Sequence, residues 1–169
     1  MNIGSKTGMT STLKSLVLAM TLAATGLSTA ASDNPEPDAT GFEINNALSG
    51  TWYNPDRSGE GFMLDVGSAG RLAVSFYTYD NYGNQMWLVG PGNVDGSVAV
   101  VDLYVTEGGF YGSAFDKDLI SEYHWGTAVF TFTECATGSV DILPDEEFLT
   151  DFEAMTTDIT RLTVPVNCD

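Results

Sequence analysis

The chain has 169 residues, of which 23 are acidic and 6 are basic, and its formal net charge is −17. A charge of that sign repels nucleic acid and anionic lipid and favours cations or basic partners. An acidic, lysine-poor surface that only confers solubility is the simpler interpretation. The length suits one domain with its own core after removal of a leader.

Residues 1–32 have the pattern of a secretory signal peptide. Lys6 and Lys14 precede an uncharged apolar run, and small residues at Ser28, Ala30 and Ser32 offer a cleavage site. We therefore predict an exported protein that is periplasmic or extracellular, with no membrane span after signal cleavage. The apolar run is short for a span, at about 15 residues, and an uncleaved anchoring helix is the alternative.

The segment after the leader has a different composition. Residues 33–46 hold two prolines, four acids and few apolar groups, which predicts a disordered or extended tether. The remaining residues, 47–169, are predicted to form a single β domain.

Period-two alternation of apolar and polar residues recurs along this domain. In residues 71–79, Leu72, Val74 and Phe76 alternate with residues of a second face, and residues 67–70 and 80–84 have the glycines and Asx residues of hairpin turns. Residues 110–115 fit no single element, while 116–122 and 145–154 are expected to be loops or short helical turns. The expected strands are residues 51–54, 62–66, 71–79, 85–89, 97–105, 126–134, 139–143 and 158–164.

Short turns join most of these strands, and no convincing crossover helix separates them, which argues against a parallel sheet. The predicted fold is therefore an all-β antiparallel meander of about eight strands, forming a closed or partly open barrel. A two-sheet β-sandwich is the alternative.

Two cysteines, Cys135 and Cys168, occur in a chain that we expect to be exported. A disulfide between them is the natural interpretation, worth roughly 3 to 4 kcal/mol in the loop-entropy model. A reactive Cys135 would need a neighbour that stabilises its thiolate, and the only histidine is His124.

Motifs for catalysis and metal binding are weak. Ser58 does not lie in a nucleophile elbow, and one histidine with two bonded cysteines leaves too few ligands for a transition metal, so we predict no catalytic residue, metal or cofactor. Glu60 and Asp65, as a pair for glycoside hydrolysis, would point to opposite faces of a continuous strand. Calcium is a further alternative, at the acids of residues 145–151 or at Asp56 and Glu60, although a solvated acidic loop explains them better.

Aromatic residues are concentrated between residues 50 and 90. If several share an open face, they form a stacking platform for sugars, peptides or small apolar ligands; if they point inward, they are core.

Arg57 either binds an anionic ligand or bridges Asp56 or Glu60 to fix its turn, and the bridging role is favoured. The candidate ligand-binding residues are Trp52, Tyr53, Asn54, Arg57, Ser58, Tyr77, Tyr79 and Trp87.

The same region carries a resemblance to a known domain. Its pattern is Gly50-x-Trp52-Tyr53-Asn54-Pro55-x-Arg57-Ser58-Gly59-x-Gly61-Phe62, followed by Phe76-Tyr77-Thr78-Tyr79-Asp80, Gly83 and Trp87, then residues 130–135, Gly138, Arg161-Leu162 and Cys168. This pattern resembles an uncharacterised β domain from secreted proteins of Gram-negative bacteria. The resemblance implies an extracytoplasmic β domain and supplies no catalytic residues.

A shorter similarity concerns residues 50–54 and Ser58, which resemble the first strand and following loop of the avidin and streptavidin family. There, the residues matching Asn54 and Ser58 hydrogen-bond the ureido group of biotin. The other motifs of that family do not occur at matching places, and Pro55 changes the loop. The shared segment also fits what a first barrel strand needs, namely a Trp to plug one end and an Asn to start a turn.

Three hypotheses for function follow. The first is an exported, non-enzymatic β-barrel module that binds a small ligand, a glycan or an envelope protein through its aromatic face, and binds no nucleic acid. The second is a hydrolase or enzyme inhibitor of the cell envelope. The third is a structural domain for envelope assembly.

Overall fold

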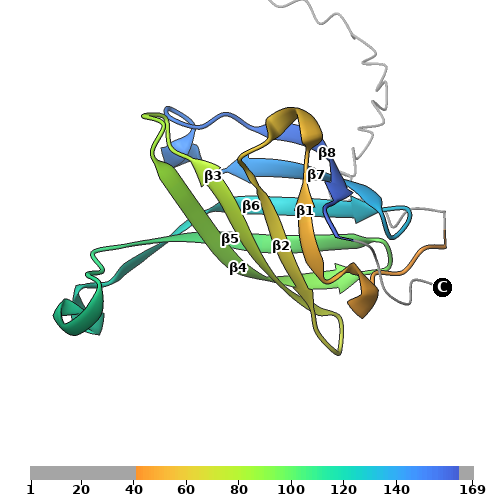
Figure 1. The fold of residues 1–169 in the computed structure, drawn as a ribbon, viewed down its shortest axis with the longest axis horizontal. Coiled ribbons are helices and arrows are strands. Elements are labelled where there is room, and N and C mark those ends of the chain that lie inside the picture. The colour runs from red at the N-terminus through yellow and green to blue at the C-terminus, as the bar shows by residue number, and fades with distance from the viewer. Residues whose placement is uncertain (1–40, 164–169) are drawn as a thin grey trace, which may run out of the picture. The chain divides into compact units, whose positions relative to one another are not determined.

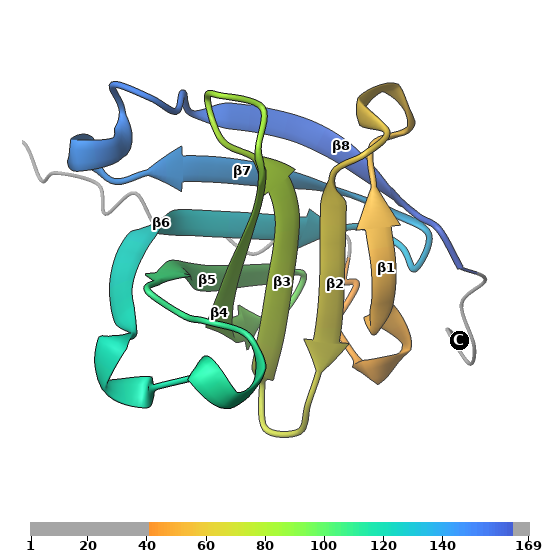
Figure 2. The same cartoon turned by 60° about the vertical axis from the view of Figure 1, so that its left-hand side comes forward.

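The computed structural model describes residues 41–163, which form a closed barrel of eight antiparallel strands. Consecutive strands lie side by side around the barrel (Figures 1 and 2), and β1 pairs with β8 to close it. The predicted meander of eight strands is thus confirmed, in its closed form. The strands are β1 (Gly50–Tyr53), β2 (Gly61–Val66), β3 (Arg71–Tyr79), β4 (Gln85–Asp95), β5 (Val98–Glu107), β6 (Ser121–Phe132), β7 (Thr137–Pro144) and β8 (Met155–Arg161).

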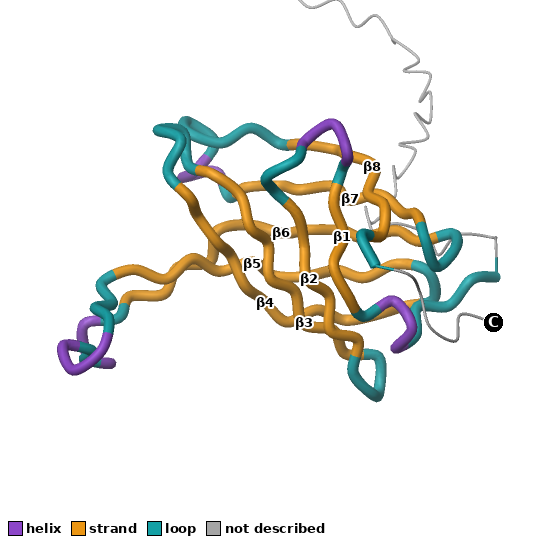
Figure 3. The backbone as a smooth tube through the Cα atoms, viewed as in Figure 1, coloured by secondary structure: helices purple, strands orange, loops and turns teal. Residues whose placement is uncertain are grey.

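Helical structure in the described part of the chain is limited to single 3₁₀ turns (Figure 3). None of the described helices is long and apolar enough to cross a membrane. The turns are η1 (Asn46–Leu48), η2 (Pro55–Arg57), η3 (Gly112–Ala114), η4 (Lys117–Leu119) and η5 (Glu146–Phe148).

The alternating pattern explains which side chains fill the barrel. In β3, Leu72, Val74 and Phe76 are buried, while the residues between them face outward. Alternating residues are also buried in the barrel part of β5 (Ala99, Val101 and Leu103) and of β6 (Ala128, Phe130 and Phe132). Because a strand places successive side chains on opposite faces, one apolar face per strand is enough to fill a closed barrel.

The strand β4 is longer than predicted. The predicted strand ends at Val89, before Gly90, Pro91 and Gly92, which are typical strand breakers. Instead β4 continues to Asp95 and pairs with β3 from Gln85 to Asn93. The pairing of β4 with β5 is interrupted between Val89 and Gly92, so the proline lies where that ladder is already broken.

The hairpin turns follow the predicted chemistry in part. Gly83 has φ 82° in the turn between β3 and β4, as expected of a glycine in the left-handed region. In the turn between β2 and β3 the left-handed residues are Ala69 (φ 58°) and Gly70 (φ 66°). The non-glycine residue Ala69 therefore takes a conformation that we had assigned to glycine.

One end of the barrel is closed by η1 and by Trp52. The Trp52 indole is fully buried, and its Nε1 donates a hydrogen bond to the Leu48 carbonyl oxygen at 3.0 Å. The Arg161 guanidinium lies 5.6 Å from the Trp52 ring centroid and donates to the carbonyl oxygens of Ala47 and Ser49. These contacts join β1, β8 and η1 at this end.

Ordered structure begins earlier than we expected from the sequence. Phe42 and Ile44, at the end of the predicted tether, pack against the core, and the Ile44 amide donates to the Gly96 carbonyl oxygen at 2.9 Å. The rest of the predicted tether, the predicted signal peptide and Cys168 lie outside the described residues. Cys135, which follows β6, is partly buried against the core.

The strands β5 and β6 continue beyond the barrel as a protruding hairpin, which we term the finger (residues 104–124; Figure 1). It begins at a β-bulge, where the strand register shifts between Leu103 and Tyr104. Its tip contains η3, within residues 110–115, which fitted no single element, and η4, within residues 116–122, which we expected to be a loop or short helical turn; β6 begins at Ser121. The tip exposes four apolar side chains, Phe110, Tyr111, Phe115 and Leu119.

Candidate ligand-binding cavity at the barrel mouth

The eight candidate residues predicted from the sequence fall into separate places. Trp52 belongs to the core of the closed end, so it takes no part in an exposed aromatic face. Tyr53, Tyr77 and Trp87 lie on the outer wall, and Ser58 is exposed in the loop between β1 and β2. Only Asn54, Arg57 and Tyr79 lie at the open end, which we term the mouth.

The outer-wall aromatics form a small cluster. Tyr77 of β3 and Trp87 of β4 are directly paired across the two strands, and their side chains are 47% and 55% exposed. On the other side, Tyr77 pairs with Gly61 of β2, which has no side chain, and its hydroxyl contacts the Met63 sulfur at 3.9 Å. The structure thus places Phe76 in the core and its neighbour Tyr77 outside.

A cavity of about 300 Å³ opens at the mouth. It lies between the ends of β3, β6, β7 and β8 and the loops that follow β1, β3 and β7. Its apolar lining comes from aromatic and aliphatic side chains, and its polar lining comes mainly from the loops. The lining residues are Arg57, Glu60, Phe76, Thr78, Tyr79, Asp80, Asn81, Trp125, Ile142, Asp151, Phe152, Glu153, Ala154 and Met155.

Trp125 enters the cavity wall because of the bulge at the base of the finger. The register passes from Leu103 opposite Gly126 to Tyr104 opposite His124, which leaves Trp125 as the extra residue. A bulge re-aims side chains in this way. Trp125 is only 3% exposed, yet its indole Nε1 has no hydrogen-bond partner among the described residues.

Phe152 covers Trp125 from the loop between β7 and β8. The two rings meet edge to face with centroids 5.3 Å apart, and Phe148 packs on the same indole at 6.3 Å. The Asp145 amide also donates to the Trp125 carbonyl oxygen at 2.9 Å. This loop is therefore held against the cavity by both backbone and aromatic contacts.

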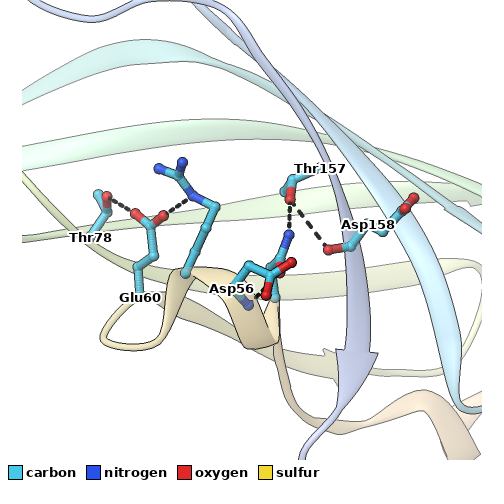
Figure 4. Close-up of polar contacts among 7 residues, drawn as sticks. Asp56, Glu60, Thr78, Thr157 and Asp158 are labelled. Carbon is cyan, nitrogen blue, oxygen red and sulfur yellow. Dashed lines mark hydrogen bonds and ion pairs between the residues drawn. The ribbon is translucent and has the colours of Figure 1, made fainter.

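On the opposite side, Glu60 links the loop between β1 and β2 to β3 (Figure 4). Its Oε2 accepts a hydrogen bond from the Thr78 hydroxyl at 2.8 Å, and its Oε1 accepts from Arg57 Nε. Arg57 thus has the bridging role that we favoured from the sequence, with Glu60 as its partner. The side chain of Glu60 is only 14% exposed, whereas that of Arg57 is 48% exposed.

Asn54 has a structural role beside this bridge. Its Oδ1 caps η2 by accepting from the Asp56 amide at 2.8 Å, and its Nδ2 donates to the Thr157 hydroxyl of β8 at 2.7 Å (Figure 4). The expected turn-forming role of this asparagine is confirmed. Because both ends of its amide are engaged, the loop is fixed to β1 and β8.

Two of the acidic residues at the mouth, Asp80 and Asp151, are engaged in loop contacts. Asp80 accepts hydrogen bonds from the Tyr82 and Asn84 amides and from the Asn84 side chain, and the Asn84 side-chain bond is the main cause that lowers the pKa of Asp80. Asp151 accepts from the Asn81 side chain at 2.9 Å, which joins the β3–β4 and β7–β8 loops. Among the described residues, no cluster of three or more potential metal ligands occurs.

His124 connects the finger to the β7–β8 loop. Its Nδ1 lies 2.6 Å from Asp145 Oδ2, and its Nε2 lies 3.6 Å from Asp102 Oδ1. The hydrogen bond with Asp145, supported by Asp102, raises the pKa of His124 above its ordinary value. This contact holds the start of the loop that carries Phe152.

The raised pKa makes a pH-dependent contribution to stability that can be measured. Because the folded state binds the proton more tightly, the stabilisation is complete below the unfolded pKa of about 6.5 and is lost as the pH rises through the higher folded pKa. We expect His124→Gln to lower the free energy of unfolding most at acidic pH, by about 0.2–1 kcal/mol, because the pair is partly exposed. The melting temperature of the variant should fall accordingly. Thermal unfolding of the wild type and the variant, from below the unfolded pKa to above the folded pKa of His124, checks this prediction. A difference in melting temperature that does not vary with pH contradicts it.

Several cavity residues escaped prediction from the sequence. Trp125 immediately precedes the predicted strand at Gly126, and nothing in its own pattern marks a bulge. Phe148 and Phe152 lie four residues apart, a helical spacing, and this was the available signal that the loop has an apolar side. Glu60 and Thr78 meet because Glu60 directly precedes β2, which pairs with β3.

Comparison of this chain with protein-family models, with curated proteins and with solved structures finds no match.

Proposed function

We propose that this protein is an exported, non-enzymatic binding domain that holds a small organic molecule in the mouth of its barrel. Eight-stranded barrels have an interior that is either filled by side chains or just wide enough for one small ligand. Here, the filled part includes the stacked pair of Phe62 and Phe76, whose ring centroids are 4.5 Å apart. Phe76 also lines the cavity of about 300 Å³, a volume at the lower end of the range for small-molecule sites.

The observation that carries the proposal is the wall formed by Trp125. A bulge directs this large aromatic residue inward, and its buried indole N–H lacks an acceptor among the described residues. An unsatisfied buried donor costs about 1–3 kcal/mol. A ligand that brings an acceptor as well as apolar surface offsets that cost.

The loops around the cavity are also well fixed. The Asn81–Asp151 and Asn54–Thr157 hydrogen bonds and the Glu60 bridge connect loops and strands that are far apart in the sequence. A site that is ordered before binding loses less conformational entropy when a ligand enters. The mouth is thus suited to bind without a large rearrangement.

A second groove, of about 700 Å³, lies on the outer wall over the ends of β6, β7 and β8. It is larger than the mouth cavity, but threonine, serine and aspartate side chains supply most of its lining. No aromatic residue takes part in that lining, so it offers no ring on which a ligand could stack. For this reason we place the ligand at the mouth.

Blocking the cavity tests the proposal. Ala154 is exposed and lines the cavity, so Ala154→Trp places a large side chain there without disturbing the core. Native mass spectrometry of the protein recovered from the organism that produces it should show a bound small molecule on the wild type and none on this variant. Far-UV circular dichroism verifies that the variant is folded.

The matched control is Trp87→Ala, which removes an aromatic residue from the outer wall and should leave the bound mass unchanged. If this control loses the ligand while Ala154→Trp keeps it, the site lies on the outer wall. A wild-type protein that carries no ligand overturns the proposal.

A further inference from the structure

The charges around the mouth cavity are strongly unbalanced. Four carboxylates, of Glu60, Asp80, Asp151 and Glu153, line it together with a single guanidinium, that of Arg57. Glu60 forms an ion pair with Arg57, so these two charges compensate each other. Three carboxylates at the rim are then left without a cationic partner among the described ion pairs.

The three rim carboxylates come from two loops that face the same cavity. Asp80 belongs to the loop between β3 and β4, whereas Asp151 and Glu153 belong to the loop between β7 and β8. Asp80 and Asp151 accept hydrogen bonds only from neutral groups, which orient these carboxylates but cancel no charge. The exposed Glu153 has no described hydrogen bond or ion pair.

The lining below this rim is aromatic. Phe76, Trp125 and Phe152 all contribute to the cavity wall, and all three are largely buried. Aromatic faces attract cations, and most strongly when water is excluded. The acidic rim and the aromatic wall therefore favour the same sign of ligand charge.

We infer that the ligand of the mouth cavity is an organic cation, an ammonium group attached to an apolar body that also carries an acceptor for the Trp125 indole N–H. The apolar body packs against Phe76, Trp125 and Phe152, and the ammonium group lies near the carboxylates of Asp151 and Glu153. The net charge of −17 strengthens the attraction at long range. This inference rests on the proposed function, since it assigns the ligand class of that same site.

Three probes of matched shape test the inference. They are the 4-hydroxy derivatives of 2-phenylethylamine, 2-phenylethanol and phenylacetate, which are cationic, neutral and anionic near neutral pH and share a phenolic oxygen that can accept from the Trp125 indole N–H. Each is titrated into the full-length mature protein at an ionic strength of about 0.15 M, where distant surface charges are largely screened. Binding is followed by the methyl NMR signals of Ile142 and Met155, which both line the cavity.

We expect the amine to bind about tenfold more tightly than the alcohol, and the phenylacetate derivative to bind most weakly. Glu153→Gln, at an exposed position that leaves the core intact, should weaken binding of the amine about threefold to tenfold and leave binding of the alcohol unchanged. The control Glu122→Gln removes an exposed carboxylate from the finger, which does not line the cavity, and should change neither affinity.

The outcomes separate the inference from the proposed function. If the alcohol or the phenylacetate derivative shifts the same methyl signals with equal or higher affinity, the ligand class is wrong and the binding site stands. If Glu122→Gln weakens the amine as much as Glu153→Gln does, the attraction comes from the overall charge and the inference also fails. If none of the three probes shifts the cavity signals, the proposed function itself fails.

Discussion

Trp52→Ala is expected to lower the free energy of unfolding by about 3–5 kcal/mol, the usual cost of truncating a buried Trp. The Trp52 side chain is fully buried and packs edge to face on Phe132, with ring centroids 4.9 Å apart. Its removal also deprives the Leu48 carbonyl of the indole donor and the Arg161 guanidinium of the ring on which it lies. Urea unfolding followed by circular dichroism measures the change.

The matched control is Trp87→Ala. Trp87 is of the same residue type but is 55% exposed on the outer wall, so its loss should change stability by no more than about 0.5 kcal/mol. If Trp52→Ala does not fold, Trp52→Phe takes its place. This variant keeps a buried ring but loses the indole hydrogen bond, at a cost of about 1–2 kcal/mol. Equal urea midpoints for the two alanine variants would contradict the assignment of Trp52 to the core.

Gly90→Ala should destabilise the barrel by about 3 kcal/mol or more, at or above the upper end of the usual cost of overpacking. A Cβ atom at Gly90 would lie 1.6 Å from the Asp102 carbonyl oxygen and 2.7 Å from its carbonyl carbon. The obstacle is backbone, which cannot rotate away as a side chain does. The strands β4 and β5 must therefore separate at this point, next to the place where their ladder is already interrupted.

Gly67→Ala is the comparison for this experiment. The nearest atom to a Cβ at Gly67 is the Arg71 carbonyl oxygen at 3.6 Å, an ordinary contact distance, and Gly67 has no positive φ. The added methyl group should leave stability unchanged or raise it by about 0.4–1 kcal/mol. Thermal unfolding of both variants gives the two values, and a Gly90→Ala protein that melts with the wild type would show that β4 and β5 do not approach this closely.

The parts of the fold that depend on local pattern could be predicted from the sequence. Alternation in β3 assigned Leu72, Val74 and Phe76 to one face, and the barrel interior is that face. Turn chemistry predicted that Gly83 takes the left-handed position of the turn between β3 and β4. Such features are set by residues a few positions apart, which is why a single sequence is enough to predict them.

The end of β4 and the position of Trp125 could not be predicted in that way. Pro91 breaks a strand only when its amide is needed, and here the missing donor falls in a gap of the ladder that no local pattern indicates. The bulge at Trp125 depends on Gly126, where a Cβ would lie 2.3 Å from the Leu143 carbonyl oxygen of the neighbouring strand. Both features are decided by the approach of another strand.

The candidate site also combines features that the local sequence pattern predicts with features that only the packed barrel decides. The sequence indicated that aromatic residues are concentrated between residues 50 and 90, and it left open which of them point inward. The barrel register sends Trp52 to the core and Tyr77 to the outer wall, and it leaves Tyr79 at the mouth. The cavity then gains Trp125 and Phe152 from segments far along the chain, and no spacing rule joins those segments to Arg57.

The seam between β1 and β8 bears on how this barrel forms and how it fails. Among the described residues, two residue pairs connect the two strands, Trp52 with Arg161 and Tyr53 with Thr160, whereas ten connect β5 and β6. The hairpins can form early from neighbouring segments, but the seam must bring together opposite ends of the domain, at a cost in chain entropy. Before it closes, or when it opens, β1 and β8 present unpaired strand edges, and such edges template aggregation. The Arg161 contacts with Trp52, Ala47 and Ser49 thus protect the solubility of the protein as well as its shape.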